Sequence, residues 1–138
     1  MQTKPKLEFR PLEDNLSILR YSPGTAVPEE LWHANFLSVT KCVDELSIVI
    51  SGEITIDKIE ALLGSPRKQS LNWSGLMVVG PLSHDMIGIM AEISRVLAAA
   101  HCSIFALSTY DTDYILVPSD KRELALDALS KDGHKILV

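Results

Sequence analysis

The stretch IFALSTYDTDYILVP, residues 104–118, decides the fold expected for this chain of 138 residues. Both ends are rich in β-branched, aromatic and other apolar residues, as strands are, whereas residues 108–113 at the centre are polar or carry a hydroxyl group. The stretch therefore predicts a strand–turn–strand hairpin. Because a buried polar group without a partner costs about 1–3 kcal/mol, the centre needs hydrogen bonds within the turn, or a ligand.

An earlier segment repeats this plan. The stretch FLSVTKCVDELSIVI, residues 36–50, also reads as two strands around a polar centre, and a shift of 68 positions places Glu45 on Asp113. Each hairpin is followed by a helical pattern that stops at a glycine, Gly64 or Gly133. The two halves of the chain therefore appear as variants of one unit.

A further strand is expected before each hairpin. A short strand is also expected after the helix that follows each hairpin. In the second half, strand 75–80 leads into apolar residues at helical spacing, with a polar face opposite. In the first half, strand 16–21 is followed by SPGTAVPEELWHAN, whose prolines and glycine leave room for only a turn or so of helix near 29–33. The apolar stripe comprises Ile89, Ile93, Val96 and Ala100, the polar face Glu92 and Arg95, and the last strands about 69–73 and 134–138.

This order of elements predicts an α+β fold made of two ferredoxin-like βαββαβ repeats with antiparallel sheets. The first repeat has a shortened first helix. We expect an N-terminal tail at 1–11, the first repeat at 12–73 and the second at 74–138. One continuous α+β domain without a true repeat is the alternative. With a right-handed crossover, the end of strand 75–80 lies near the centre of the second hairpin.

The composition narrows the functional classes. Apolar residues make up 46% and charged residues 22%, as in globular proteins, and the net charge of -5 argues against nucleic-acid binding. No run reaches the roughly 18 apolar residues of a membrane span, and residues 1–15 lack an apolar signal core, so we expect a cytoplasmic protein. Cys42 and Cys102 fit no metal or redox spacing and are expected to be small buried hydrophobes.

Catalytic motifs are absent. The chain has no nucleophile elbow, phosphate loop or dinucleotide glycine pattern. The four histidines, His33, His84, His101 and His134, are dispersed, so no metal site is expected and no cofactor is implied. The sequence therefore predicts a protein that is not an enzyme. The alternative is a small-acid isomerase or hydrolase that uses His84, Asp85 or Asp113 as acid or base.

One constellation suits a small ligand. In GPLSHDMIG, residues 80–88, Gly80 permits close backbone approach, and the first amides of the following helix attract a carboxylate. Opposite stand Thr109, Tyr110 and Asp113, and the acid suits an ammonium or guanidinium group. A free α-amino acid carries both charges on adjacent groups. A strand end, a helix cap and an ordinary hairpin turn are the structural alternatives for these residues.

The stretch GPLSHDMIGIMAEISRVLAAAHCSIFALSTYDTDYILVP, residues 80–118, resembles the ACT-domain family. It is most similar to small two-repeat bacterial ACT proteins related to the CASTOR arginine sensors and to aspartate-kinase regulatory regions, and residues 12–64 resemble them less closely. The resemblance implies tandem ACT folds and a regulatory module that binds small ligands, usually amino acids, at ACT–ACT interfaces. A protein–protein interaction or structural module with no ligand is the alternative.

The resemblance also assigns ligand-binding positions, residue by residue. The family's loop glycine matches Gly80 or Gly88, and the first repeat contributes a strand end. Since the arginine sensors have four repeats and this chain has two, a complete site implies a homodimer, and the histidine in the loop argues against arginine itself. The remaining implied positions are His84, Asp85, Ile87 and Ile89 in the loop, Thr109, Tyr110 and Asp113 in the hairpin, and Ser38 and Val39 in the first repeat.

Overall fold

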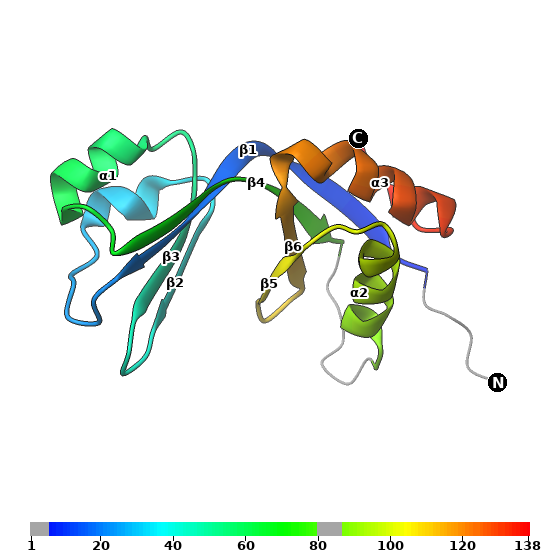
Figure 1. The fold of residues 1–138 in the computed structure, drawn as a ribbon, viewed down its shortest axis with the longest axis horizontal. Helices are drawn as coiled ribbons and strands as arrows, with labels where there is room; N and C mark the ends of the chain where they lie inside the picture. Colours follow the sequence, from blue (N-terminus) through cyan, green and yellow to red (C-terminus); the bar gives the residue numbers. More distant parts are fainter. Residues whose placement is uncertain (1–5, 80–86) are drawn as a thin grey trace. The chain divides into compact units, whose positions relative to one another are not determined.

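The computed structural model describes residues 6–79 and 87–138 (Figure 1). The fold is α+β, with antiparallel strand pairs, one parallel pair and three α-helices in the described part of the chain. Two compact units divide the chain, one formed by residues 14–73 and the other by residues 1–13 together with 74–138. Each unit has a hydrophobic core of its own.

The unit of residues 14–73 contains most of β1 (Glu8–Tyr21), which pairs antiparallel with β3 (Leu46–Ser51). In turn, β3 pairs with β2 (Leu37–Lys41). A 3-10 helix, η1 (Glu29–His33), and helix α1 (Ile56–Leu63) complete the unit. Its buried core consists of Leu19, Tyr21, Leu31, Leu46, Ile48, Ile50 and Ile59.

The other unit contains the end of β4 (Lys68–Val78) and the start of β1, whose Glu8 carbonyl accepts a hydrogen bond from the Val79 amide at 2.8 Å. Strand β4 neighbours β6 (Asp113–Pro118), which pairs antiparallel with β5 (Phe105–Ser108). Strand β7 pairs parallel with β1 through Glu8 and Lys135. The remaining elements are α2 (Ile89–Ala99), β5 (Phe105–Ser108), β6 (Asp113–Pro118), η2 (Ser119–Lys121), α3 (Arg122–Lys131) and β7 (Lys135–Ile136).

Several local predictions are confirmed. Both hairpins form, as β2–β3 and β5–β6. Helix α1 ends at Gly64, whose φ of +84° is a conformation that favours glycine, and Gly133 with φ of +98° follows α3. Along α2 the apolar stripe faces the core, because Ile93 and Val96 are buried.

No helix among residues 6–79 and 87–138 has the length and apolar composition of a membrane crossing.

Other expectations differ from the structure. Residues 8–11, expected in a tail, belong to β1, and Phe9 is fully buried beneath the helices of its unit. The short strand expected at 69–73 and the strand expected at 75–80 are one strand, β4, which contains no proline and continues past Asn72 although the φ of that residue is +65°. Cys102 is buried as expected, whereas Cys42 is exposed in the turn after β2. The carboxylate of Glu92 is buried rather than solvated, since it has basic partners described below.

Candidate functional site

The β5–β6 turn satisfies much of its own polar chemistry. The Ser108 hydroxyl donates to Asp113 Oδ1 at 2.5 Å where the two strands meet the turn. Within the turn, the Thr109 amide donates to the Thr112 carbonyl at 2.8 Å, and the Thr112 amide donates to Thr109 Oγ1 at 3.3 Å. The Asp113 carboxylate thus has one oxygen engaged with a neutral hydroxyl. No Lys or Arg among the described residues is within ion-pair distance of it in the structure, so it can attract a cationic group.

Thr112 joins this turn to the end of β4. Its side chain is buried, and its hydroxyl donates a hydrogen bond to the carbonyl of Val78. The chain passes from Val78 toward the glycine-containing segment 80–88 two residues later. The sequence predicted that the strand end and the hairpin would lie together, and this contact confirms that adjacency.

The remaining loop positions divide into exposed and buried groups. The side chain of Ile87 is 86% exposed, and Gly88 adopts φ of +87° directly before α2. By contrast, Ile89 is buried in the core of its unit. Tyr110, at the tip of the hairpin, is 82% exposed and offers a large aromatic surface to solvent. Three predicted positions, Gly80, His84 and Asp85, lie outside the described residues.

The two predicted positions in the first half lie on β2. Ser38 pairs with Val49 and Val39 with Ile48 in the antiparallel β2–β3 ladder. Because side chains alternate along a strand, the two point to opposite faces, and Val39 packs against the buried core of its unit. Ser38 therefore lies on the face away from that core.

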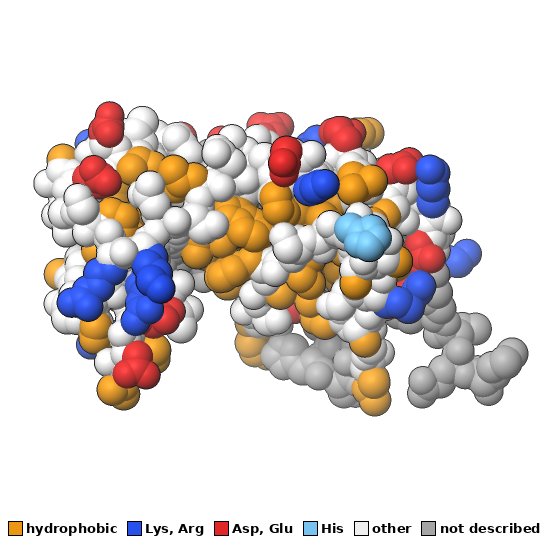
Figure 2. Space-filling view, viewed as in Figure 1, with side chains coloured by type: hydrophobic (Ala, Val, Ile, Leu, Met, Phe, Trp, Pro, Cys, Tyr) orange, Lys and Arg blue, Asp and Glu red, His pale blue; other side chains and the backbone are white. Residues whose placement is uncertain are grey.

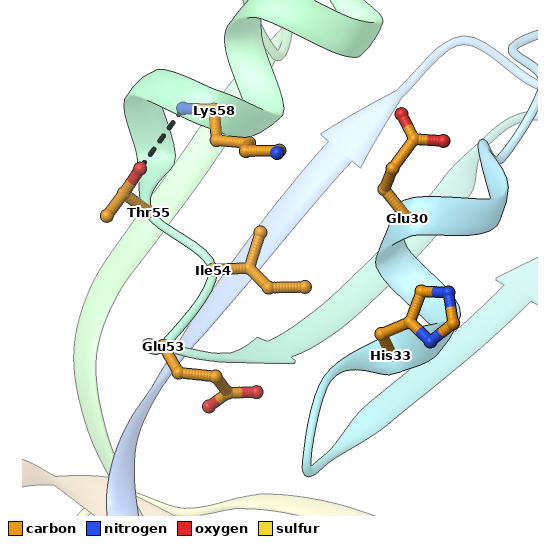
Figure 3. Close-up of a pocket in the computed structure, with 6 residues that line it drawn as sticks. All are labelled: Glu30, His33, Glu53, Ile54, Thr55 and Lys58. Carbon is orange, nitrogen blue, oxygen red and sulfur yellow. Dashed lines mark hydrogen bonds between the residues drawn. The ribbon is translucent and has the colours of Figure 1, made fainter.

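A pocket absent from the sequence analysis lies in the unit of residues 14–73, between η1 and the start of α1 (Figure 3). Its volume of about 400 Å³ falls within the range of small-molecule sites. Its lining residues are Glu30 and His33 from η1 and Glu53, Ile54, Thr55 and Lys58 from the β3–α1 junction. The sequence could not place these two segments together, because they lie some twenty residues apart and no spacing rule connects them. The one usable sequence signal was the helix start at Thr55, whose hydroxyl accepts a hydrogen bond from the Lys58 backbone amide at 3.2 Å.

The Glu53 carboxylate in this pocket is held in place. Its Oε1 accepts a hydrogen bond from the backbone amide of Asn35 at 2.6 Å and one from the Ser51 hydroxyl at 2.7 Å. Burial acts to raise the pKa of Glu53, but these hydrogen bonds outweigh it, and the pKa lies below its ordinary value. Glu53 is therefore a fixed anion at neutral pH.

A third polar cluster lies at the ends of α2 and α3. His134 Nδ1 accepts a hydrogen bond from the Leu7 amide at 3.1 Å, so the neutral ring carries its hydrogen on Nε2, 3.2 Å from Glu92 Oε1. Arg95 contacts both Glu92 at 3.0 Å and Asp132 at 2.9 Å. The arrangement of Glu92, Asp132 and His134 has the compactness of a metal site. However, the imidazole proton and the Arg95 guanidinium already occupy the lone pairs that an ion would need, so the chemistry is that of a hydrogen-bonded network.

Comparisons with known proteins identify the class. Residues 70–131 match the family model of the ACT domain. The crystal structure of protein Atu0741 from Agobacterium tumefaciens is 32% identical and superposes with a TM-score of 0.80, and the match covers 97% of this chain and 94% of that one. We conclude that the chain belongs to the same family as Atu0741 and that its residues 70–131 are similar to the ACT domain.

Two further similarities have narrower scope. The cytosolic arginine sensor for mTORC1 subunit 1 of Mus musculus is 34% identical over 87 residues, which are 62% of this chain but only 26% of the sensor. The regulatory subunit of aspartate kinase from Thermus thermophilus superposes with a TM-score of 0.62 at 14% identity, over 89% of this chain and 95% of that one. At this identity the second similarity concerns the fold alone.

Proposed function

We propose that this chain is a non-enzymatic regulatory module that binds a free amino acid or a similar small molecule. The ligand lies between the glycine-containing loop 80–88 and the polar strand residues 107–113, at an interface between ACT repeats. The two repeats comprise residues 12–73 and 74–138, and η1 is the shortened first helix of the first repeat. The module acts in the cytoplasm as a homodimer, without nucleic acid or membrane.

The observation that carries this proposal is the hydrogen bond from Thr112 to the Val78 carbonyl. It holds the hairpin beside the point at which the chain enters the loop. The Asp113 carboxylate then faces the ammonium of the ligand, while the amides at the start of α2 bind its carboxylate. The exposed Ile87 and Tyr110 contribute apolar surface that the ligand or a second chain covers.

The comparisons support the same class of function. A relative named as an arginine sensor matches most of this chain, and the fold is shared with regulatory subunits of aspartate kinase. A binding role also fits the absence of a catalytic motif in the sequence. Binding biases the arrangement of repeats or chains only as far as the ligand prefers one of them.

A calorimetric screen of the twenty amino acids tests the proposal. We expect at least one to bind, and the Thr109→Ala, Asp113→Ala double variant to lose that binding. Asp111→Asn is the matched control, because Asp111 is an exposed acid in the same turn that the proposal does not use. Silence across the panel at millimolar concentration contradicts the proposal. In that case, partner capture that persists in the double variant supports a protein–protein interaction module.

A further inference from the structure

The pocket between η1 and α1 presents charges of both signs around an apolar floor. Figure 3 shows Lys58 and Ile54 directed from the α1 side toward η1, with Glu30 and His33 on the facing side and Glu53 at the edge. We propose that this pocket is a second ligand site, which binds a small zwitterion bearing an ammonium and a carboxylate. This site is separate from the one between loop 80–88 and the hairpin, and it does not depend on it.

Glu53 provides the position for the ammonium group. The Ser51 hydroxyl that bonds to it is completely buried and is itself bonded by the Phe36 amide at 2.8 Å. Both of these donors bind Oε1, so these two hydrogen bonds leave Oε2 to a ligand. An ionised carboxylate that is already oriented loses little conformational freedom on binding, which favours a charge-assisted hydrogen bond to a ligand.

Lys58 provides the position for the carboxylate. Its backbone amide is bonded to Thr55, which fixes the first turn of α1, but its ammonium has no ion-pair or hydrogen-bond partner within the described residues. Glu30 is likewise unpaired there, on the other side of the pocket. The β3–α1 side of the pocket therefore offers Glu53 as an anion and Lys58 as a cation, which no ion pair joins, as a zwitterion requires, and Glu30 on η1 is a second anion.

The apolar part of the pocket sets the kind of side chain that fits. Ile54 lines the pocket and packs against the core of residues 14–73, so the floor is anchored rather than free. A volume of about 400 Å³ accommodates an amino acid with a linear aliphatic chain. A ligand with one charge only would leave either Glu53 or Lys58 without a partner.

The test uses L-norleucine together with its two single-charge analogues, pentylamine, which lacks the carboxylate, and hexanoate, which lacks the amine. Calorimetry is performed on the full chain carrying Thr109→Ala and Asp113→Ala, so that the hairpin site does not contribute. We expect norleucine to bind at least about tenfold more tightly than either analogue, because each lost charge removes a charge-assisted contact. Equal binding of pentylamine, or no heat from any of the three at millimolar concentration, overturns the proposal.

Variants of the pocket locate the binding. Glu53→Gln keeps an oxygen for the Asn35 and Ser51 donors while it removes the charge, and we expect it to weaken norleucine binding about tenfold. Lys58→Gln, on an exposed helical position, should do the same. Glu29→Gln is the matched control, since Glu29 is an exposed acid on η1 that does not line the pocket. Unchanged affinity in both pocket variants overturns the assignment.

Fluorescence supplies a second readout. Trp32 is 61% exposed on η1, next to the pocket residue His33, and the chain contains one other tryptophan, Trp73. In a Trp73→Phe background the emission of Trp32 should change with norleucine concentration and follow the calorimetric curve. An emission that stays constant through saturation would place the binding elsewhere.

Discussion

Replacing the buried His134 by alanine should lower the free energy of unfolding by about 3–5 kcal/mol. The imidazole accepts from the Leu7 amide at 3.1 Å and donates to Glu92 at 3.2 Å, with its side chain only 1% exposed. An unpaired buried amide costs about 1–3 kcal/mol, and a lost hydrogen bond to a charged group costs about 1.5–3 kcal/mol. The edge-on contact with the Phe9 ring, 5.9 Å between centroids, is lost as well.

Urea denaturation followed by circular dichroism measures this change. The midpoint should fall while the slope of the transition stays constant, because the surface exposed on unfolding is nearly unchanged. His134→Asn retains an acceptor near the position of Nδ1 but lacks the donor to Glu92, so its loss should be intermediate. His101→Asn is the control, since His101 is exposed and its φ of +57° is one that asparagine tolerates.

Two results would refute this reasoning. A loss below about 1 kcal/mol in His134→Ala would mean that water replaces both hydrogen bonds, contrary to the burial of the ring. Equal losses in His134→Ala and His134→Asn would mean that the Leu7 contact contributes nothing. In that second case β1 would not be anchored through residue 7, and the assignment of residues 6–13 to this core would need another explanation.

Three further predictions concern charge, packing and backbone. The pKa of Glu53 is lowered in the folded chain, so the stability that its carboxylate contributes is complete above its ordinary pKa and is lost as the pH falls through the lower folded value. Urea midpoints measured between neutral and acid pH should therefore vary less in Glu53→Gln than in the unchanged chain. Ile93→Ala should cost about 2–5 kcal/mol by opening a core cavity, whereas Ile87→Ala, at an exposed position, should change stability by less than about 0.5 kcal/mol in the same assay. Gly64→Ala should cost about 1–2 kcal/mol because φ is +84°, and its thermal midpoint should fall below that of Gly24→Ala, whose site is open and has no such φ.

The local elements were predictable because their signals lie within a few residues of one another. Apolar segments on either side of a polar centre marked both hairpins, and the spacing of Ile93 and Val96 marked the buried face of α2. Glycine after each helical pattern marked two helix ends. The prolines before η1 limited it to a short 3-10 helix. These features follow from backbone sterics and side-chain periodicity, which act locally.

The candidate site was predictable in part. The polar hairpin and its nearness to the end of β4 followed from strand order and crossover handedness, and the Thr112–Val78 contact bears out that placement. Ile89 was expected both in the apolar stripe and at the ligand, and its burial agrees with the stripe. The exposure of Tyr110 did not follow, because it depends on which side of the hairpin meets the core. Residue type alone carries little information about that choice.

By itself, the amino-acid sequence determined the kinds of elements, their order and most of their ends, because hydrogen bonding and sterics between near neighbours specify them. Only the tertiary structure decided that β1 and β4 run unbroken through the boundary between two units, that Glu92 is buried beside His134, and that Glu30 and Lys58 line one pocket. Each of these depends on residues distant in the chain, whose approach is governed by the burial of whole faces.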